Sequence, residues 1–193
     1  MPKSDHNAAH YFIETHLEAG RGEAIAFIEA ASGKRISYGT LSANSSKVAG
    51  ALTKAGIKRE ERAAILMLDS IDYVEVFWGC LKAGVIAVPI NTLLAGAVYD
   101  TILSDSRASC LFVSAALLQV VKPVLAKNDH IRKVIVVGDH PLEDGFESYQ
   151  TFTKGAPELV AVAVSPDETA FWLYSSGSTG QPKGVRHVHS SLQ

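Results

Sequence analysis

The chain has 193 residues, of which 47% are hydrophobic, and a formal net charge of −2 at pH 7. This length predicts one domain, or a large part of one, that buries roughly 70% of the surface its unfolded chain exposes. The composition is too apolar for a disordered chain, and the scattered basic residues indicate neither a nucleic-acid partner nor a membrane surface. Cys80 and Cys110 are expected to be buried free thiols, because two cysteines are too few for a disulfide framework.

The N-terminal part predicts a helix, a hairpin and a second helix. Asn7 can cap a helix that continues to about Ala19. The runs 23–29 and 35–38 flank a Ser-Gly-Lys turn and predict a β-hairpin, after which a helix is expected over residues 40–54.

Alternating strands and helices follow. The continuous apolar run 62–68 predicts a parallel strand buried on both faces, and residues 71–83 form the clearest amphipathic helix, with Phe77 and Trp78 expected in the core. Residues 139–167 are predicted to be a long connection with one short helix. Between these, strands are predicted at 85–90, 110–113 and 133–137, and helices at 97–104 and 115–127.

This alternation predicts an α/β fold, a mostly parallel sheet with helices on both faces. The N-terminal residues lack the apolar core of a signal peptide, and no apolar run reaches the roughly 20 residues that a membrane helix needs. We therefore expect a cytoplasmic protein.

The most informative segment is Tyr174-Ser-Ser-Gly-Ser-Thr-Gly-Gln-Pro-Lys-Gly-Val185, which directly follows the apolar run 170–174. Its glycines permit close backbone approach, so that successive N–H groups can converge on an anion. Its hydroxyls add donors, and its lysine adds a point charge suited to phosphate. The segment is therefore predicted to bind phosphate through Ser175, Ser176, Gly177, Ser178, Thr179, Gly180, Lys183 and Gly184.

This segment differs from the common P-loop, in which Gly-Lys is followed by Ser or Thr at the start of a helix. Here Lys183 lies between Pro182 and Gly184, and residues 185–189 alternate like a strand. The lysine is therefore expected on a mobile, hairpin-like flap. The alternative is a flexible Ser/Gly linker, but linkers rarely have an aromatic strand on one side.

Two groups of residues could hold a metal ion. Asp69, Asp72 and Glu75 could form an acid/base pair or a magnesium site, but they flank the start of a predicted helix, where capping of free N–H groups accounts for them. His187 and His189 are expected on one side of an extended strand. Because no third ligand is near in sequence, packing or a position close to substrate is favoured over a metal site.

Two arginines are further candidates as phosphate ligands. Arg107 is expected to form an ion pair at a helix end. Arg186 either touches phosphate or lies on a solvated strand face.

The segment Ser175–Gly184 resembles the phosphate-binding signature of the AMP-forming adenylating enzymes, which include acyl-CoA synthetases, luciferases and peptide-synthetase adenylation domains. The resemblance extends from about Ala8 to the last residue. Within that superfamily, three further stretches are similar to benzoate and 4-hydroxybenzoate CoA ligases: Phe77-Trp-Gly-Cys-Leu-Lys-Ala-Gly84 continuing into Val88-Pro-Ile-Asn-Thr-Leu-Leu94, then Asp105-Ser-Arg-Ala108, and Phe171-Trp-Leu-Tyr174.

The resemblance implies an acid–thiol ligase that uses ATP, Mg²⁺ and coenzyme A. In such ligases a small-molecule carboxylate attacks the α-phosphorus of ATP, and coenzyme A then displaces AMP from the acyl-adenylate. Lys183 would be the catalytic residue of the first step, where it neutralises charge on the departing pyrophosphate.

Members of the resembled family are more than twice as long as this chain. Residues 1–193 are therefore expected to be a partial N-terminal AMP-binding domain that lacks the acyl pocket, the adenine site and the C-terminal domain. We expect such a chain to be inactive alone and to form homo-oligomers through uncovered apolar surface.

Two other functions remain open. The chain could be a non-catalytic nucleotide- or partner-binding module that kept the fold. It could also be a phosphotransferase with an unusual P-loop, which is disfavoured because no Ser or Thr follows Lys183. Carboxylate-dependent ATP–pyrophosphate exchange separates a ligase from a binding module, and ADP as product would indicate the phosphotransferase.

Overall fold

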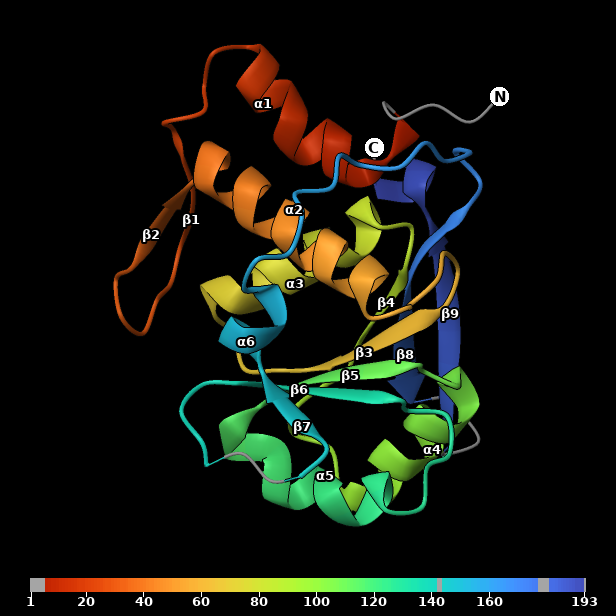
Figure 1. The fold of residues 1–193 in the computed structure, drawn as a ribbon. Helices are drawn as coiled ribbons and strands as arrows, with labels where there is room; N and C mark the ends of the chain where they lie inside the picture. The colour runs from red at the N-terminus through yellow and green to blue at the C-terminus, as the bar shows by residue number, and fades with distance from the viewer. Residues whose placement is uncertain (1–5, 142–143, 177–180, 193) are drawn as a thin grey trace.

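A seven-stranded sheet lies at the centre of the computed structural model, with helices on both of its faces (Figure 1). The structure describes residues 6–141, 144–176 and 181–192. The strand order is β7-β6-β5-β3-β4-β8-β9, and all neighbouring pairs are parallel except β8–β9. The sheet strands are β3 (Arg62–Leu66), β4 (Ile86–Pro89), β5 (Cys110–Ser114), β6 (Lys133–Val137), β7 (Phe146–Ser148), β8 (Thr169–Ser176) and β9 (Pro182–Val188).

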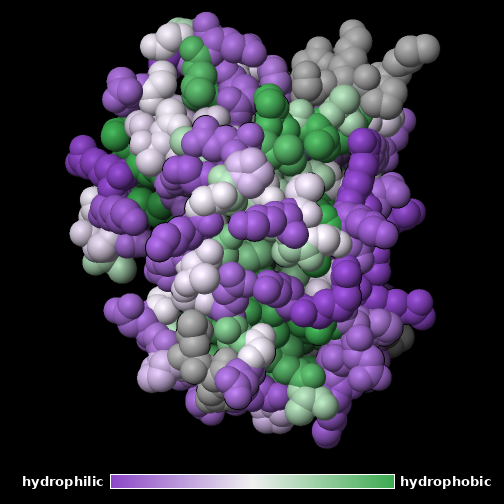
Figure 2. Space-filling model, viewed as in Figure 1, coloured by the Kyte–Doolittle hydropathy of each residue, from purple (hydrophilic) through white to green (hydrophobic). Residues whose placement is uncertain are grey.

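The predicted N-terminal hairpin is a separate antiparallel pair, formed by β1 (Ile25–Ile28) and β2 (Arg35–Ser37). Ile25, Phe27 and Ile28 of β1 are exposed. Figure 2 shows hydrophobic surface at the left of the molecule, where Figure 1 places this hairpin. The helical segments are η2 (His10–Glu14), α1 (Thr15–Glu18), α2 (Tyr38–Lys54), α3 (Ile71–Lys82), α4 (Gly96–Ser106), η3 (Ala115–Leu117), α5 (Leu118–Leu125), α6 (Tyr149–Thr153) and η4 (His189–Leu192).

Two hydrophobic layers hold the sheet between its helices. Along β3, Ala63 and Ile65 enter the layer shared with α2, α3 and α6, whereas Ala64 and Leu66 enter the layer shared with α4 and α5. Successive side chains of a strand point to opposite faces, so a strand covered on both faces needs apolar residues at every position. This explains the unbroken apolar run in the sequence and confirms the predicted mostly parallel α/β fold.

Helices α2 and α3 pack closely because one glycine has no side chain. A Cβ atom at Gly79 would lie 2.5 Å from Val48 Cβ. Phe77 and Trp78 are partly buried against the same layer, as predicted. Cys80 also lies there, fully buried and free of disulfide bonds.

A buried lysine connects the N-terminal helical segment to these two helices. Lys82, on α3, is 1% exposed and its Nζ lies 2.6 Å from Glu14 Oε1. The ammonium also donates to the backbone and hydroxyl oxygens of Ser42 and to Ser46 Oγ on α2. Burial lowers the pKa of Lys82, and the ion pair with Glu14 opposes this shift.

The observed elements differ from the predicted ones in three places. The 139–167 connection contains β7, a short parallel edge strand, in addition to the short helix α6. The helix predicted over 115–127 begins as the 3₁₀ turn η3, and α5 ends at Leu125. The first helix has a π-helical segment, η2, although Asn7 Oδ1 does accept the Ala9 N–H near its start.

Candidate functional site

Strands β8 and β9 form the hairpin that was predicted around the glycine- and serine-rich segment. Tyr174 pairs with Gly184, Ser175 with Lys183, and Ser176 with Pro182. Because β8 runs parallel to β4, β8 ends at the carboxyl edge of the sheet, where ligands bind in open α/β folds. Of the predicted phosphate-binding residues, Gly177, Ser178, Thr179 and Gly180 lie outside the described residues.

One face of the hairpin carries a stacked aromatic pair at its core end and Lys183 near the connection. At the core end, Phe171 stacks on His187 with ring centroids 4.5 Å apart and an interplanar angle of 4°. Pairs across an antiparallel ladder share a face, and pairs two residues apart lie on the same face. The Ser175–Lys183 pair therefore lies on the face that bears Phe171 and His187. Lys183 is exposed and forms no ion pair with a described residue, so its ammonium is available to an anion.

The opposite face of the hairpin is fixed by Tyr174. Its phenol lies over Gly184, where a Cβ atom would be 3.1 Å from Tyr174 Cζ. Tyr174 Oη donates a 2.5 Å hydrogen bond to Asp105 Oδ2 in the last turn of α4. Burial, and then the Asp105 carboxylate, raise the pKa of Tyr174, so the hydroxyl remains protonated and donates.

A cavity of about 400 Å³ adjoins the end of the hairpin that carries Ser175 and Pro182. Its wall is mostly apolar, and it meets the predicted phosphate segment at Ser175. Figure 1 shows α4 beside the ends of β8 and β9, which is where this cavity lies. The lining residues are Asn91, Leu94, Val98, Ile102, Tyr174, Ser175 and Pro182.

Neither of the two arginines lies on the hairpin face that bears Lys183. Arg186 is exposed on β9 but belongs to the face opposite Lys183, since it pairs with Trp172. The predicted ion pair of Arg107 is wrong within the described part of the chain. Arg107 instead ends α4 in the left-handed region, at φ 47°, and its carbonyl accepts from Arg62 Nη2.

The two histidines do not share a strand face, which overturns the expectation made from the alternating sequence. Strand β9 ends at Val188, and His189 begins the 3₁₀ segment η4. His189 is buried, and its Nδ1 accepts a hydrogen bond from the backbone N–H of Ala8. His187 remains on β9, stacked on Phe171.

The acidic group Asp69, Asp72 and Glu75 is divided between two environments. Glu75 is buried and accepts hydrogen bonds from Asn44 and Tyr149, and burial raises its pKa. Capping of α3 comes from Ser70, whose Oγ accepts the Tyr73 N–H at 3.2 Å, rather than from an aspartate. Asp72 lies in the first helical turn, where a negative charge is favourable.

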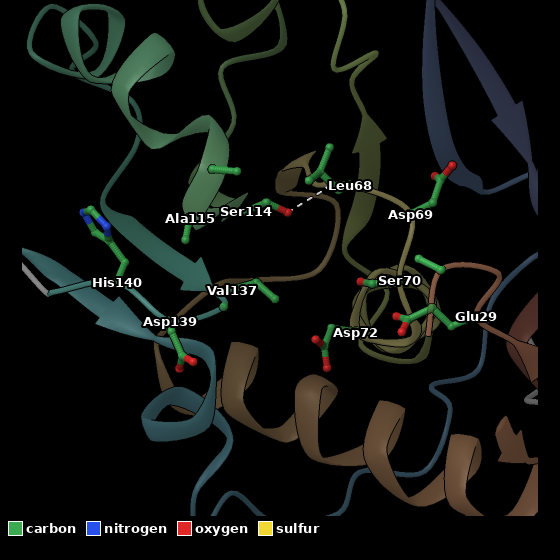
Figure 3. Close-up of a pocket in the computed structure, with 13 residues that line it drawn as sticks. Glu29, Leu68, Asp69, Ser70, Asp72, Ser114, Ala115, Val137, Asp139 and His140 are labelled. Atoms are coloured by element: carbon green, nitrogen blue, oxygen red, sulfur yellow. Dashed lines mark hydrogen bonds between the residues drawn. The ribbon is translucent and has the colours of Figure 1, made fainter. Parts of the chain in front are cut away.

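Asp69 and Asp72 line a larger cavity, of about 670 Å³, at the carboxyl ends of β3, β5 and β6 (Figure 3). Figure 3 shows Asp139 and His140 on one side of it and Glu29 and Asp69 on the other. Four carboxylates repel phosphate, so this cavity does not compete with the β8–β9 hairpin as a phosphate site. The described residues contain no group of three or more His, Cys, Asp or Glu side chains that could hold a metal ion.

Across the described residues, every helix is too short or too polar to cross a lipid bilayer.

Comparison with known proteins gives the family. A family model described as "AMP-binding enzyme" matches residues 14–193. A 4-hydroxybenzoate–CoA/benzoate–CoA ligase from Rhodopseudomonas palustris is 39% identical over 99% of this chain and 35% of its own length. A benzoate–CoA ligase from Thauera aromatica is 37% identical over 97% of the chain and 35% of its own length.

Solved structures agree with this assignment. The anthranilate CoA ligase AuaEII superposes with a TM-score of 0.88 at 31% identity, over 95% of this chain and 35% of that protein. A benzoate CoA ligase from Burkholderia xenovorans superposes with a TM-score of 0.81 at 32% identity, with the same coverage. The chain thus spans about 35% of the length of the relatives it matches. With the family model matching nearly all of its residues, the chain belongs to the AMP-binding enzyme family.

Proposed function

We propose that this chain is the N-terminal, phosphate-binding part of an ATP-dependent, AMP-forming carboxylate–CoA ligase. The observation on which the proposal rests is the β8–β9 pairing, which sets the exposed Lys183 directly opposite Ser175 at the carboxyl edge of the sheet. A lysine and a hydroxyl on one face, next to a glycine-rich connection, suit the β- and γ-phosphates of ATP.

In the proposed first step, a carboxylate oxygen of the acid attacks the α-phosphorus of ATP. The bond from the α-phosphorus to the bridging oxygen breaks, and the electron pair leaves with pyrophosphate. Lys183 would neutralise charge that develops on this leaving group, and the residues Ser175, Ser176, Gly177, Ser178, Thr179, Gly180 and Gly184 would hold the phosphates in line.

In the second step, the thiolate of coenzyme A attacks the acyl carbonyl and expels AMP. Mg²⁺ would act in the first step, where it would enter with ATP and neutralise part of the negative charge of the phosphates. No pyrophosphate is present in the second step, so Lys183 would contribute little to it. The two half-reactions therefore test the role of the hairpin separately.

We further propose an aromatic carboxylic acid, benzoate or 4-hydroxybenzoate, as the acid that is activated. Support comes from the relatives: two aromatic-acid ligases are 39% and 37% identical over nearly the whole chain, and a third, from Thauera aromatica, is 33% identical over 100% of it. A fatty-acid ligase from Mycobacterium tuberculosis is 34% identical over only 86% of the chain.

The test is AMP formation by the whole encoded protein with ATP, coenzyme A and one acid at a time: benzoate, 4-hydroxybenzoate or a long-chain fatty acid. AMP release with either aromatic acid supports the proposal. AMP release only with the fatty acid would reject the aromatic assignment but keep the ligase. ADP as product, or no acid-dependent ATP–pyrophosphate exchange with any acid, would reject the ligase.

A further inference from the structure

Tyr174 is the last residue of β8 before the phosphate segment, and three contacts fix it. Its hydroxyl donates to Asp105 on α4, its ring lies over Gly184 of β9, and it packs against the hydrophobic layer shared with α4 and α5. These contacts join β8, β9 and α4 at one point, one residue before Ser175.

Asp105 is an unusual residue for its place. It lies in the last turn of α4, where the helix dipole disfavours a negative charge. A carboxylate there needs a partner, and the partner is Tyr174 Oη at 2.5 Å. No local pattern relates the two residues, which are 69 positions apart.

A cation also lies at the end of α4. Arg62, at the start of β3, donates from Nε to the carbonyl of Ser106 at 2.8 Å and from Nη2 to that of Arg107, which satisfies the end of α4. Its guanidinium also lies 5.9 Å from the Trp172 ring centroid on β8. Trp172 and Tyr174 are two residues apart, so the contact of Trp172 to Arg62 and that of Tyr174 to Asp105 come from the same face of β8.

We infer that the Tyr174–Asp105 hydrogen bond is a positioning device for the phosphate-binding hairpin, which makes Tyr174 and Asp105 positioning residues for ATP. The pair acts from the face opposite Ser175 and Lys183 and does not touch the phosphates itself. Because Tyr174 pairs with Gly184 and Ser175 with Lys183, fixing the phenol fixes the register and twist of the strands beside the lysine. The inference rests on the proposed function, since it assumes that the hairpin binds ATP.

The test uses the whole encoded protein with four variants of the pair: Tyr174→Phe, Asp105→Ala, Asp105→Asn and the double variant that combines Tyr174→Phe with Asp105→Ala. The matched control is Tyr149→Phe, because Tyr149 Oη donates to the Glu75 carboxylate at 2.8 Å and so loses the same type of bond away from the hairpin. Lys183→Ala tests the proposed function itself. For each protein we would measure the dissociation constant of ATP by calorimetry, the KM for ATP, the KM for the acid in pyrophosphate exchange, and the melting temperature.

Tyr174→Phe and Asp105→Ala should each weaken ATP binding and raise the KM for ATP by about three- to tenfold. This is less than the full effect of losing a hydrogen bond to a charged group, because the pair acts on ATP only through the hairpin. The KM for the acid should not change. The double variant should bind ATP as well as either single variant does, because each single variant already removes the same hydrogen bond. Asp105→Asn keeps an acceptor oxygen and should lie between wild type and Asp105→Ala.

A structural role alone predicts a different pattern, in which Tyr174→Phe and Tyr149→Phe both lower the melting temperature and neither changes the constants for ATP. That result, with Lys183→Ala impaired, would overturn the inference and leave the proposed function intact. If Lys183→Ala also leaves ATP binding and exchange unchanged, the proposed function falls instead. Additive effects in the double variant would show that Tyr174 and Asp105 act independently and would likewise overturn the inference.

Discussion

His189 Nδ1 accepts a 3.1 Å hydrogen bond from the backbone N–H of Ala8, a residue 181 positions earlier in the chain. Both groups are buried. The contact holds the N-terminal helical segment against the end of the β8–β9 hairpin. Only a neutral imidazole can accept at Nδ1, so this contact depends on the protonation state of His189.

The fold should therefore lose stability as His189 becomes protonated. Burial lowers the pKa of His189 to about 4 from 6.5, although Glu168 alone would raise it, and Arg59 nearby adds to the lowering. Between these values the unfolded chain binds a proton that the folded chain does not. The free energy of unfolding should thus be unaffected by His189 above about pH 6.5 and fall by about 2–3 kcal/mol as the pH approaches 4.

Urea unfolding of wild type and His189→Gln at about pH 7 and about pH 5 would check this. Glutamine can accept the Ala8 N–H without titrating, so the variant should lose less stability between the two conditions. His130→Gln is the control, because His130 is exposed, and it should behave like wild type. An equal pH dependence in all three proteins would show that His189 does not control acid stability.

Lys183→Ala should separate the two half-reactions of the whole encoded protein. Acyl-adenylate formation should slow by on the order of 10²-fold, because the ammonium would stabilise charge on pyrophosphate. Thioester formation from a supplied acyl-adenylate should change little. Lys58→Ala is the control, since Lys58 is exposed and precedes β3 at the opposite edge of the sheet. Equal losses in both half-reactions would contradict the assigned role.

Gly79→Ala should destabilise the chain by about 1–3 kcal/mol through overpacking. The new Cβ would lie 2.5 Å from Val48 Cβ and 2.9 Å from the Ser45 carbonyl oxygen, so α2 and α3 would have to separate. Gly22→Ala should be near neutral, because the added methyl group would meet no heavy atom within 4 Å and the backbone there is not left-handed. The urea unfolding midpoints of the two variants would measure this difference. Equal midpoints would show that α2 and α3 accommodate the added methyl group without loss of stability.

The elements that the sequence predicted best are those with a strong periodic or continuous apolar signal. The run 62–68 predicted β3 because a strand buried on both faces has no polar position, and residues 71–83 predicted α3 because one stripe of that helix is apolar. Strand β7 was missed because it has three half-buried residues, Phe146–Ser148, at the edge of the sheet, where neighbouring β6 rather than local sequence determines pairing.

Part of the candidate site could be found by its residue types alone. The glycine-rich connection and Lys183 indicate phosphate through local chemistry. The Tyr174–Asp105 contact has no such signal, since α4 and β8 come together only in the folded sheet. The one available hint was an aspartate directly after the helix predicted over 97–104, where the helix dipole disfavours a negative charge. Likewise, the alternation up to His189 could not show that the strand ends at Val188.

The final prediction is self-association of the 193-residue chain through the hairpin face. Leu173 and Val185 pair across β8 and β9 and are 42% and 48% exposed, which leaves an apolar pair uncovered. Edge-to-edge pairing of β9 with a second copy is disfavoured, because Pro182 cannot donate at one end and Lys183 and Arg186 would meet like charges. Contact should therefore be face to face and should strengthen with sulfate, as apolar burial does.

Sedimentation velocity over a wide range of protein concentration would measure this association. Changing Leu173 and Val185 together to glutamine should shift the chain toward monomer. Val160→Gln is the matched control, because Val160 is 80% exposed but lies in the connection before β8, away from the pair. Association that persists unchanged in the double variant would place the contact elsewhere, and the exposed β1 residues Ile25, Phe27 and Ile28 would then be the next surface to alter. A wild-type chain that stays monomeric throughout would show that the Leu173–Val185 pair is too small to hold two copies together.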